Sequence, residues 1–311
     1  MGNHSIVTEF LLMGFSDDYD MQALHFVIFL SVYLMAVVGN ILIIIAVALD
    51  HHLHSPMYFF LANLSFLDVC YISTTVPKSI AVSITKNNVI SFAGCVVQVF
   101  LVVTFVGGEL FLLTIMAYDR YVAICHPLQY NMIMNWSACI QMAAAAWIST
   151  LIHAMLETSL TFRVTFCGSN KIGQYFCDMP LLQKISCSDT KVHQIITMVI
   201  AVNGSTFCIG LLLVSYGYIF SAVLKIPSVQ ARYKVFSTCT PHLTVFSLFM
   251  TTVIFSYMIP KTLSTPIVDL VSACLYTVLP PVLNPIIYCL RNKDVQKSSW
   301  RIASTLKQLL G

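Results

Sequence analysis

The sequence predicts an all-α membrane protein, a bundle of seven transmembrane helices followed by a short amphipathic helix. The first observation is composition: of 311 residues, 58% are hydrophobic and only 9% are charged, whereas roughly a quarter are charged in ordinary soluble domains. The second is that apolar stretches of about 20 residues, long enough to cross a hydrocarbon core about 30 Å thick, recur along nearly the whole chain. The third is that polar breaks divide these stretches into seven.

The polar breaks set the expected helix bounds. They predict helices over residues 24–49, 57–80, 95–121, 138–160, 193–224, 236–259 and 267–289. Beyond the last of these, Lys293 and Arg301 are mixed with Val295 and Trp300, which suits a short helix lying in the membrane interface. A disordered basic tail is the alternative. Without an apparent repeat or linker, we expect one domain over residues 1–311, with an N-terminal segment (1–23), a helix bundle (24–289) and a C-terminal tail (290–311).

The two tails indicate how the chain crosses the membrane. Basic residues of the loops decide little, because nine lie inside and seven outside when the N-terminus is placed outside. The first 22 residues, however, carry no Lys or Arg, while the last 21 carry five. Asn3 also opens a glycosylation triplet that is usable only if the N-terminus is lumenal. We therefore expect a plasma-membrane protein with an extracellular N-terminus and a cytoplasmic C-terminus, inserted by its first helix without a cleaved signal peptide.

Several classes of function are disfavoured. Nucleic acid is not an expected partner, because the net charge is only +3 and the basic residues are scattered. A transporter or channel calls for inverted repeats or a polar path, which the sequence does not suggest. An enzyme is not expected either, since His51, His52 and His54 lie in a short turn with Asp50 as the nearest carboxylate, and no catalytic motif is present.

The eleven cysteines divide by compartment. Cys95 opens the 95–121 helix, and Cys167, Cys177 and Cys187 lie in the long outer loop before residue 193. Four thiols in an oxidising space can form two disulfides by any of three pairings. Most of the other cysteines are expected to be buried packing residues.

Six segments, spread from the first helix to the last, carry a family resemblance. They are Gly39-Asn40, Pro56–Leu61 (PMYFFL), Met116–Cys125 (MAYDRYVAIC), Ser215-Tyr216, Lys234–Leu243 (KVFSTCTPHL) and Pro281–Tyr288 (PVLNPIIY). In this order they resemble the vertebrate odorant receptors of the tetrapod-type class, within the rhodopsin-like G-protein-coupled receptors. The ordered set is much more specific than any one segment.

The resemblance implies a function and partners. We expect binding of small, mostly neutral, hydrophobic volatile ligands, activation of a stimulatory olfactory-type heterotrimeric G protein and a rise in cyclic AMP. Trafficking chaperones and membrane lipids are further expected partners. A receptor used outside the nose for an endogenous small lipid or metabolite is the alternative. With the family we also expect the disulfide pairs Cys95–Cys177 and Cys167–Cys187.

The resemblance assigns an activation switch to the inner half of the bundle. Asp119 restrains Arg120 at rest, and Arg120 moves toward Tyr216 when the 236–259 helix swings outward to admit the G protein. His242, eight residues after Lys234, should lie about two turns in from the inner end of that helix, facing Tyr216. The full set of expected switch residues is Asp119, Arg120, Tyr121, Tyr216, His242, Asn284, Pro285 and Tyr288.

Asp68 and Glu109 are the two acids expected deepest in the membrane. Glu109 lies eleven residues before Arg120, about 16 Å along the helix axis. Two carboxyls at that depth need protons, hydrogen bonds or a shared cation. Similar receptors place sodium at this level beside an Asn like Asn284, so a sodium ion bound by Asp68 and Glu109 is one hypothesis. One proton shared by two neutralised acids is the other, and no further cofactor is expected.

A mostly apolar ligand pocket is expected in the outer half of the bundle. Val102 takes the position where receptors for cationic amines carry an aspartate, which favours neutral ligands. Two departures from the family pattern are Met250, where many relatives have an aromatic residue, and Pro241, which can shift the start of the 236–259 helix. The expected lining residues, each of which alone is more often plain packing, are Val99, Val102, Val103, Val106, Gly107, Asn203, Gly204, Phe207, Met250, Val253, Ile254, Tyr257 and Thr277.

Overall fold

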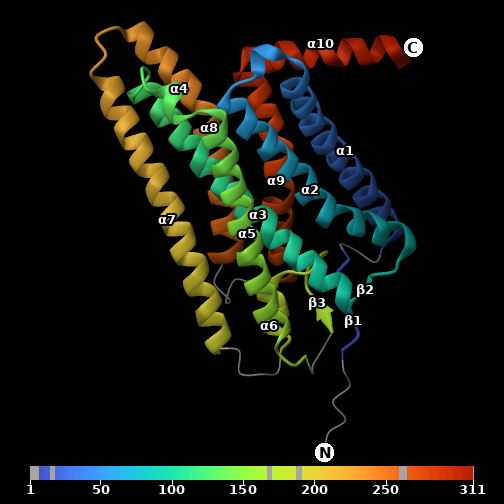
Figure 1. Ribbon diagram of the computed structural model, residues 1–311. Helices are drawn as coiled ribbons and strands as arrows, with labels where there is room; N and C mark the ends of the chain where they lie inside the picture. Colours follow the sequence, from blue (N-terminus) through green and yellow to red (C-terminus); the bar gives the residue numbers. More distant parts are fainter. Residues whose placement is uncertain (1–6, 15–17, 167–169, 187–190, 259–264, 311) are drawn as a thin grey trace, which may run out of the picture.

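The computed structural model describes residues 7–14, 18–166, 170–186, 191–258 and 265–310. Within these ranges, seven helices are long and apolar enough to cross a membrane. They form one elongated bundle, with the strand β1 (Glu9–Leu12) at one end and the helix α10 (Lys293–Leu310) at the other (Figure 1). The seven are α1 (Tyr19–Leu49), α2 (Pro56–Thr85), α3 (Phe92–Cys125), α5 (Trp136–Phe162), α7 (Lys191–Leu224), α8 (Val229–Met258) and α9 (Pro266–Arg291).

The seven predicted helices are confirmed, and most of their ends extend beyond the predicted bounds. The largest difference is α8, which begins at Val229 instead of residue 236. Hydropathy detects only the part of a helix that lies in hydrocarbon, whereas the backbone hydrogen bonds continue into the polar ends that carry Arg232 and Lys234. Pro241 lies inside α8, beyond its first residue Val229, and its effect on the helix start stays a prediction. In a bundle, neighbouring helices and side chains can satisfy the backbone group that a proline frees.

At the C-terminal end, α10 (Lys293–Leu310) lies across the bundle instead of continuing α9 (Figure 1). Its first turns are anchored, with Val295 fully buried, while Trp300 is exposed. Arg301 Nη1 lies 3.7 Å from Asp50 Oδ2, and Asp50 caps the short helix η1 (His51–Leu53) by accepting from the His52 backbone N–H. The predicted short helix after the bundle is therefore present.

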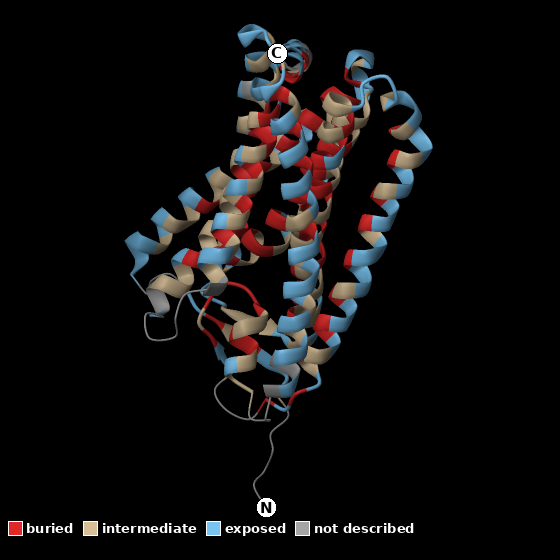
Figure 2. Ribbon diagram, turned by 90° about the vertical axis from the view of Figure 1, so that its left-hand side faces the viewer, coloured by how far each residue is buried: buried red, intermediate tan, exposed pale blue. Residues whose placement is uncertain are grey.

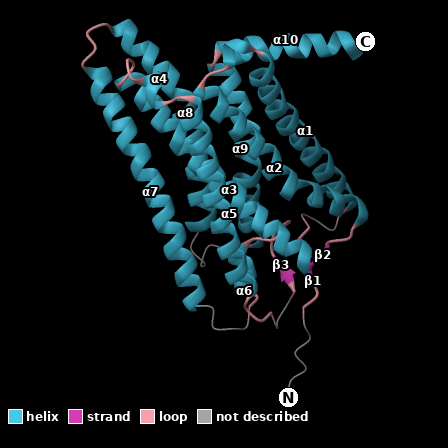
Figure 3. Ribbon diagram, in the orientation of Figure 1, coloured by secondary structure: helices cyan, strands magenta, loops and turns pink. Residues whose placement is uncertain are grey.

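At the opposite end, the described residues include a small sheet that the sequence did not suggest (Figure 3). Its central strand is β1 (Glu9–Leu12), which pairs antiparallel with β2 (Val89–Ser91) and parallel with β3 (Lys171–Ile172). Apolar side chains of this sheet, including Phe10 and Leu12, pack against the outer end of α3 in one cluster. Two short helices complete the fold, α4 (Tyr130–Ile133) after α3 and α6 (Met179–Lys184) in the long loop before α7.

Burial follows the helix faces. Buried residues line the interior of the bundle, and exposed residues cover its outer faces (Figure 2). The main apolar core joins α1, α2, α3, α5, α8 and α9, and a smaller cluster around Tyr216 joins α3, α7 and α8. The exposed apolar side chains of the outer faces are those that a bilayer would cover.

Candidate functional site

The inner end of α3 carries a buried acid and base. Arg120 Nη2 lies 3.4 Å from Asp119 Oδ2, and the Asp119 side chain is 1% exposed. Asp119 Oδ1 also accepts a hydrogen bond from Tyr130 Oη at 2.7 Å. Burial, and then the neighbouring Asp119 carboxylate, raise the pKa of Tyr130, so its hydroxyl stays protonated and can donate. The short helix α4 thus holds Asp119 from the loop between α3 and α5, a contact that the sequence did not suggest.

A second polar contact joins α7, α8 and α3 at nearly the same level. Tyr216 Oη and His242 Nδ1 lie 2.7 Å apart, and the two rings stack with centroids 5.7 Å apart. The other ring nitrogen, His242 Nε2, lies 2.8 Å from the carbonyl oxygen of Leu113. Since a carbonyl only accepts, Nε2 carries the proton and Nδ1 accepts from the Tyr216 hydroxyl. His242 therefore links α8 to α7 and to α3, the two helices from which α8 would have to separate in order to move outward.

Asp68, Glu109 and Asn284 meet deep in the interior, between α2, α3 and α9. Asn284 Nδ2 donates to both carboxylate oxygens of Asp68, at 3.2 and 3.0 Å, and the carboxyls of Asp68 and Glu109 lie within hydrogen-bond reach. Glu109 Oε1 and Asn284 Oδ1 are buried acceptors with no hydrogen-bond partner among the described residues. Two orphaned acceptors beside a carboxylate fit a small cation or an additional proton equally well.

Neighbouring family-motif residues fix α9 against α1 and α2. Asn40 Nδ2 donates to the Pro281 carbonyl at 2.8 Å. A Cβ at Gly39 would lie 3.1 Å from Pro285 Cγ, so the glycine permits a close approach of α1 to α9. Tyr288 of α9 is also buried. At the end of α3, the hydroxyl oxygen of Tyr121 lies 3.0 Å from His126 Nε2.

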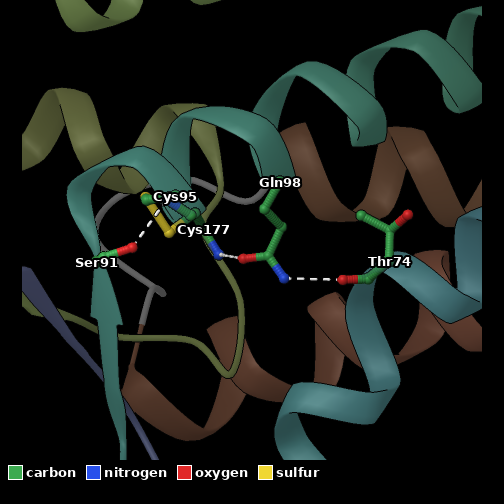
Figure 4. The surroundings of a disulfide bond; sticks show 6 residues. Thr74, Ser91, Cys95, Gln98 and Cys177 are labelled. Carbon is green, nitrogen blue, oxygen red and sulfur yellow. Dashed lines mark hydrogen bonds between the residues drawn. A yellow bond between two sulfur atoms is a disulfide. The ribbon is translucent and has the colours of Figure 1, made fainter.

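The outer end of α3 is bound to the long loop covalently. Cys95 and Cys177 form a disulfide, and Gln98 one turn further on accepts from the Cys177 backbone N–H while donating to the Thr74 carbonyl, both at 2.9 Å (Figure 4). The structure therefore contains the first of the two predicted pairs. Cys167, Cys187 and the glycosylation candidate Asn3 lie outside the described residues.

The expected pocket residues divide into two groups. Val99, Val102 and Thr277 are buried, and Val103, Val106, Gly107, Met250 and Val253 are half-buried on inward faces. Thr277 is hydrogen-bonded to Tyr175 of the outer loop, which also packs against Phe29 of α1 and which the sequence did not single out. The helix of Tyr257 is described, but its side chain is not.

The second group does not reach the interior. Phe207 and Ile254 are 64% and 50% exposed, and each lies nine residues, two and a half turns, from a buried residue of its own helix, Tyr216 and Val245. Asn203 is on the same outward face as Phe207 and donates to the Val199 carbonyl of its own helix. Gly204 is exposed in open space. These four residues are corrections to the expected pocket, because the rotation of α7 and α8 follows from packing that helical spacing alone does not fix.

Comparisons with known proteins find one family. A family model described as olfactory receptor matches residues 29–306. The chain is 50% identical over 296 residues to human olfactory receptor 14A16, which covers 95% of this chain and 96% of the relative. It is likewise 50% identical to human olfactory receptor 14I1 over 97% of both chains, and 44% identical to gorilla olfactory receptor 1G1 over 95% of both.

Proposed function

The chain belongs to the olfactory receptor family, a family of multi-pass membrane receptors and not of enzymes, and we propose that it is an odorant receptor. By this proposal it binds small, mostly neutral, hydrophobic volatiles and activates a stimulatory olfactory-type G protein, which raises cyclic AMP. The single observation that carries this proposal is the coupling of α3, α4, α7 and α8 at the inner end of the bundle. There, Tyr130 and Asp119 hold Arg120, while His242 joins α8 to α7 and α3.

The inner contacts support a two-state switch. The two contacts of His242 join α8 to α7 and to α3, so an outward movement of α8 must break the bonds of His242 to Tyr216 and to the Leu113 carbonyl. The movement would free the Tyr216 hydroxyl to meet Arg120, and would open the inner end between α3, α7 and α8 for the G protein. A ligand that favours the open arrangement then activates the receptor by shifting this equilibrium.

The outer half of the bundle supports neutral ligands. Between Cys95 and Glu109, α3 presents no acid, and Val102 occupies the level at which a counter-ion for an amine would lie. The inward residues Val99, Val102, Val103, Val106, Gly107, Met250, Val253 and Thr277 offer apolar surface with one hydroxyl. Shape and few hydrogen bonds would select the ligand, and flexible Met250 favours breadth.

Orientation and allosteric control belong to the same proposal. The Cys95–Cys177 disulfide lies at the end of the bundle that carries the N-terminal strand, and disulfides persist in oxidising compartments, which supports an extracellular N-terminus at the plasma membrane. A sodium ion, if bound, would be held by Asp68, Glu109 and the Asn284 amide oxygen, and would supply positive charge that neutralises the two acids. Trafficking chaperones are proposed partners in reaching the surface.

The test is cyclic AMP in cells that express the full chain with an olfactory-type G protein and trafficking helpers, screened against a broad panel of volatiles. We expect responses to neutral volatiles that disappear in Arg120→Ala at equal surface level. Arg163→Ala, an exposed arginine at the outer end of α5, is the matched control and should respond like the wild type. Silence of the displayed wild-type receptor across the panel, or a response that Arg120→Ala retains, would count against the proposal.

A further inference from the structure

Glu157 of α5 is a buried acid that the switch does not use. Its side chain is 1% exposed, and neither of its carboxylate oxygens has a hydrogen-bond partner within the part of the chain that the structure describes. It lies five residues before Phe162, the last residue of α5, about 7.5 Å along the helix axis. A carboxyl at this depth is costly unless something donates to it, so its surroundings must supply a donor that the described side chains do not.

Glu157 belongs to a polar stripe on the inward face of α5. The hydroxyls of Thr158 and Thr161 are buried and also have no hydrogen-bond partner among the described residues. His153, one turn nearer the cytoplasmic end, makes no hydrogen bond to Glu157. Three neighbouring polar side chains without a described hydrogen-bond partner are unusual for a packed interior, where nearly all buried polar groups are paired.

The stripe faces the valines of α3. A Cβ added at Gly107 would lie 3.3 Å from Thr150 Cγ2, so α3 and α5 are in close contact there. Glu157 follows Thr150 by seven residues, about two turns, and therefore projects from the same face of α5, nearer to the end of the helix at Phe162. Because α5 and α3 run in opposite directions, the facing part of α3 lies about seven residues before Gly107, at the level of Val99 and Val103.

An apolar cluster covers this region from outside. Val99 and Val103 belong to the cluster that includes Leu181 and Leu182 of α6 and Val164 beyond the end of α5. Helical spacing thus places Glu157 at the level of apolar walls made by α3 and the loop before α7, with only the hydroxyls of Thr158 and Thr161 as polar neighbours on its own helix face. This is the pattern of a small-molecule site, in which a few polar groups orient a ligand within apolar walls.

We propose that Glu157 is the polar anchor of the ligand site, and that the ligands it selects carry a hydrogen-bond donor, most simply the hydroxyl of an alcohol or phenol. The ligand's apolar part would lie against Val99 and Val103, and its O–H would donate to the Glu157 carboxyl. This inference rests on the proposed odorant-receptor function and narrows it: among neutral volatiles, donors bind better than the corresponding ethers, which have no O–H.

The test uses pairs of volatile alcohols and phenols with their methyl ethers, which change the donor and little else. On the wild-type receptor we expect the hydroxyl compounds to be about tenfold or more potent than their ethers, which corresponds to one hydrogen bond to a buried group. In Glu157→Leu this ratio should fall to about one, whereas Glu157→Gln should keep most of it because its amide carbonyl still accepts. Met155→Leu, on the exposed face of α5, is the matched control.

A merely structural role for Glu157 would change all potencies together and leave the hydroxyl-to-ether ratio unchanged. An equal response to alcohols and ethers in the wild type, or a ratio that persists in Glu157→Leu, would overturn the inference.

A binding readout separates this inference from the signalling proposal. The same pairs are added to purified full-length receptor, and the midpoint of thermal unfolding is recorded. We expect hydroxyl compounds to raise the wild-type midpoint more than ethers do, and the ligand-free midpoint of Glu157→Leu to exceed that of the wild type, since an unpaired buried acid is removed. Donor-dependent stabilisation without any cyclic AMP response would refute the proposed signalling and keep the anchor, whereas equal shifts for alcohols and ethers would overturn the anchor alone.

Discussion

Tyr130→Phe is expected to raise the basal activity of the receptor. The substitution keeps the aromatic ring of α4 and removes only the hydroxyl that donates to Asp119 Oδ1 at 2.7 Å. Asp119 is almost fully buried and has one other close polar partner in the described structure, Arg120 at 3.4 Å. Hydrogen bonds to charged groups contribute about 1.5–3 kcal/mol. If the bond is made only at rest, its loss shifts the resting-to-active equilibrium by roughly 10- to 150-fold.

The assay is ligand-independent cyclic AMP in cells that co-express the G protein, normalised to surface receptor. Tyr118→Phe is the matched control, because Tyr118 lies beside Asp119 in sequence but is 40% exposed and has no hydrogen bond among the described residues. Unchanged basal activity of Tyr130→Phe at equal display would show that the bond persists in the active state, and would refute the assignment of Tyr130 to the resting lock. Lower basal activity of Tyr130→Phe would indicate that the bond between Tyr130 and Asp119 stabilises the active state instead of the resting state.

Four further predictions concern the other contacts. Cys95→Ser is expected to abolish surface labelling of intact cells, while Cys70→Ser, at a free cysteine, should not; equal display of the two variants would show that surface expression does not require the Cys95–Cys177 disulfide. His242→Phe keeps a ring but loses two contacts of 2.7 and 2.8 Å, each worth about 1 kcal/mol, so basal cyclic AMP should rise; a fall would contradict the restraint. Asp68→Asn should remove any effect of replacing external and internal sodium on agonist potency, and an undiminished effect would exclude the sodium site. The backbone N–H of His52, followed by the Ser298 hydroxyl, lowers the pKa of Asp50, so its contribution to anchoring α10 is fully present above the ordinary pKa and lost as the pH falls through the lowered one. Hydrogen exchange of residues 295–302 at pH 7 and pH 3, expressed as protection factors so that the pH dependence of the intrinsic exchange rate is removed, should show lower protection at pH 3; unchanged protection would argue against this anchor.

The helices could be predicted from the sequence because each membrane-spanning helix requires a long continuous run of apolar residues. It also identified residues that lie side by side in space, such as Tyr216 with His242 and Asp68 with Asn284, since family motifs record those positions. Their roles in switching and sodium binding remain predictions.

The remaining features depend on three-dimensional packing. Phe207 and Ile254 are as apolar as Val102, so composition could not tell an outward side chain from an inward one. Tyr130 follows Asp119 by eleven residues through an irregular loop, where no periodic pattern applies. Glu157 differs again, because it is the single acid of α5 but its place in the sequence does not distinguish it as a site, and only the structure shows that both its oxygens are buried without a described partner.

The position of β1 at the centre of the small sheet has a consequence for biosynthesis. β1 is made first, but Glu9 pairs with Ser91, and Leu11 pairs with Lys171, 160 residues later in the chain. Contacts of such sequence separation form slowly, because a long loop must close before they are made. The partner β2 is available once residue 91 has been synthesised, but the three-stranded sheet is completed only after residue 172, when more than half of the chain has been made. Deletion of residues 1–12 would remove the central strand that pairs with both β2 and β3. The resulting receptor would lack this sheet, and we expect the cell's quality control to retain it.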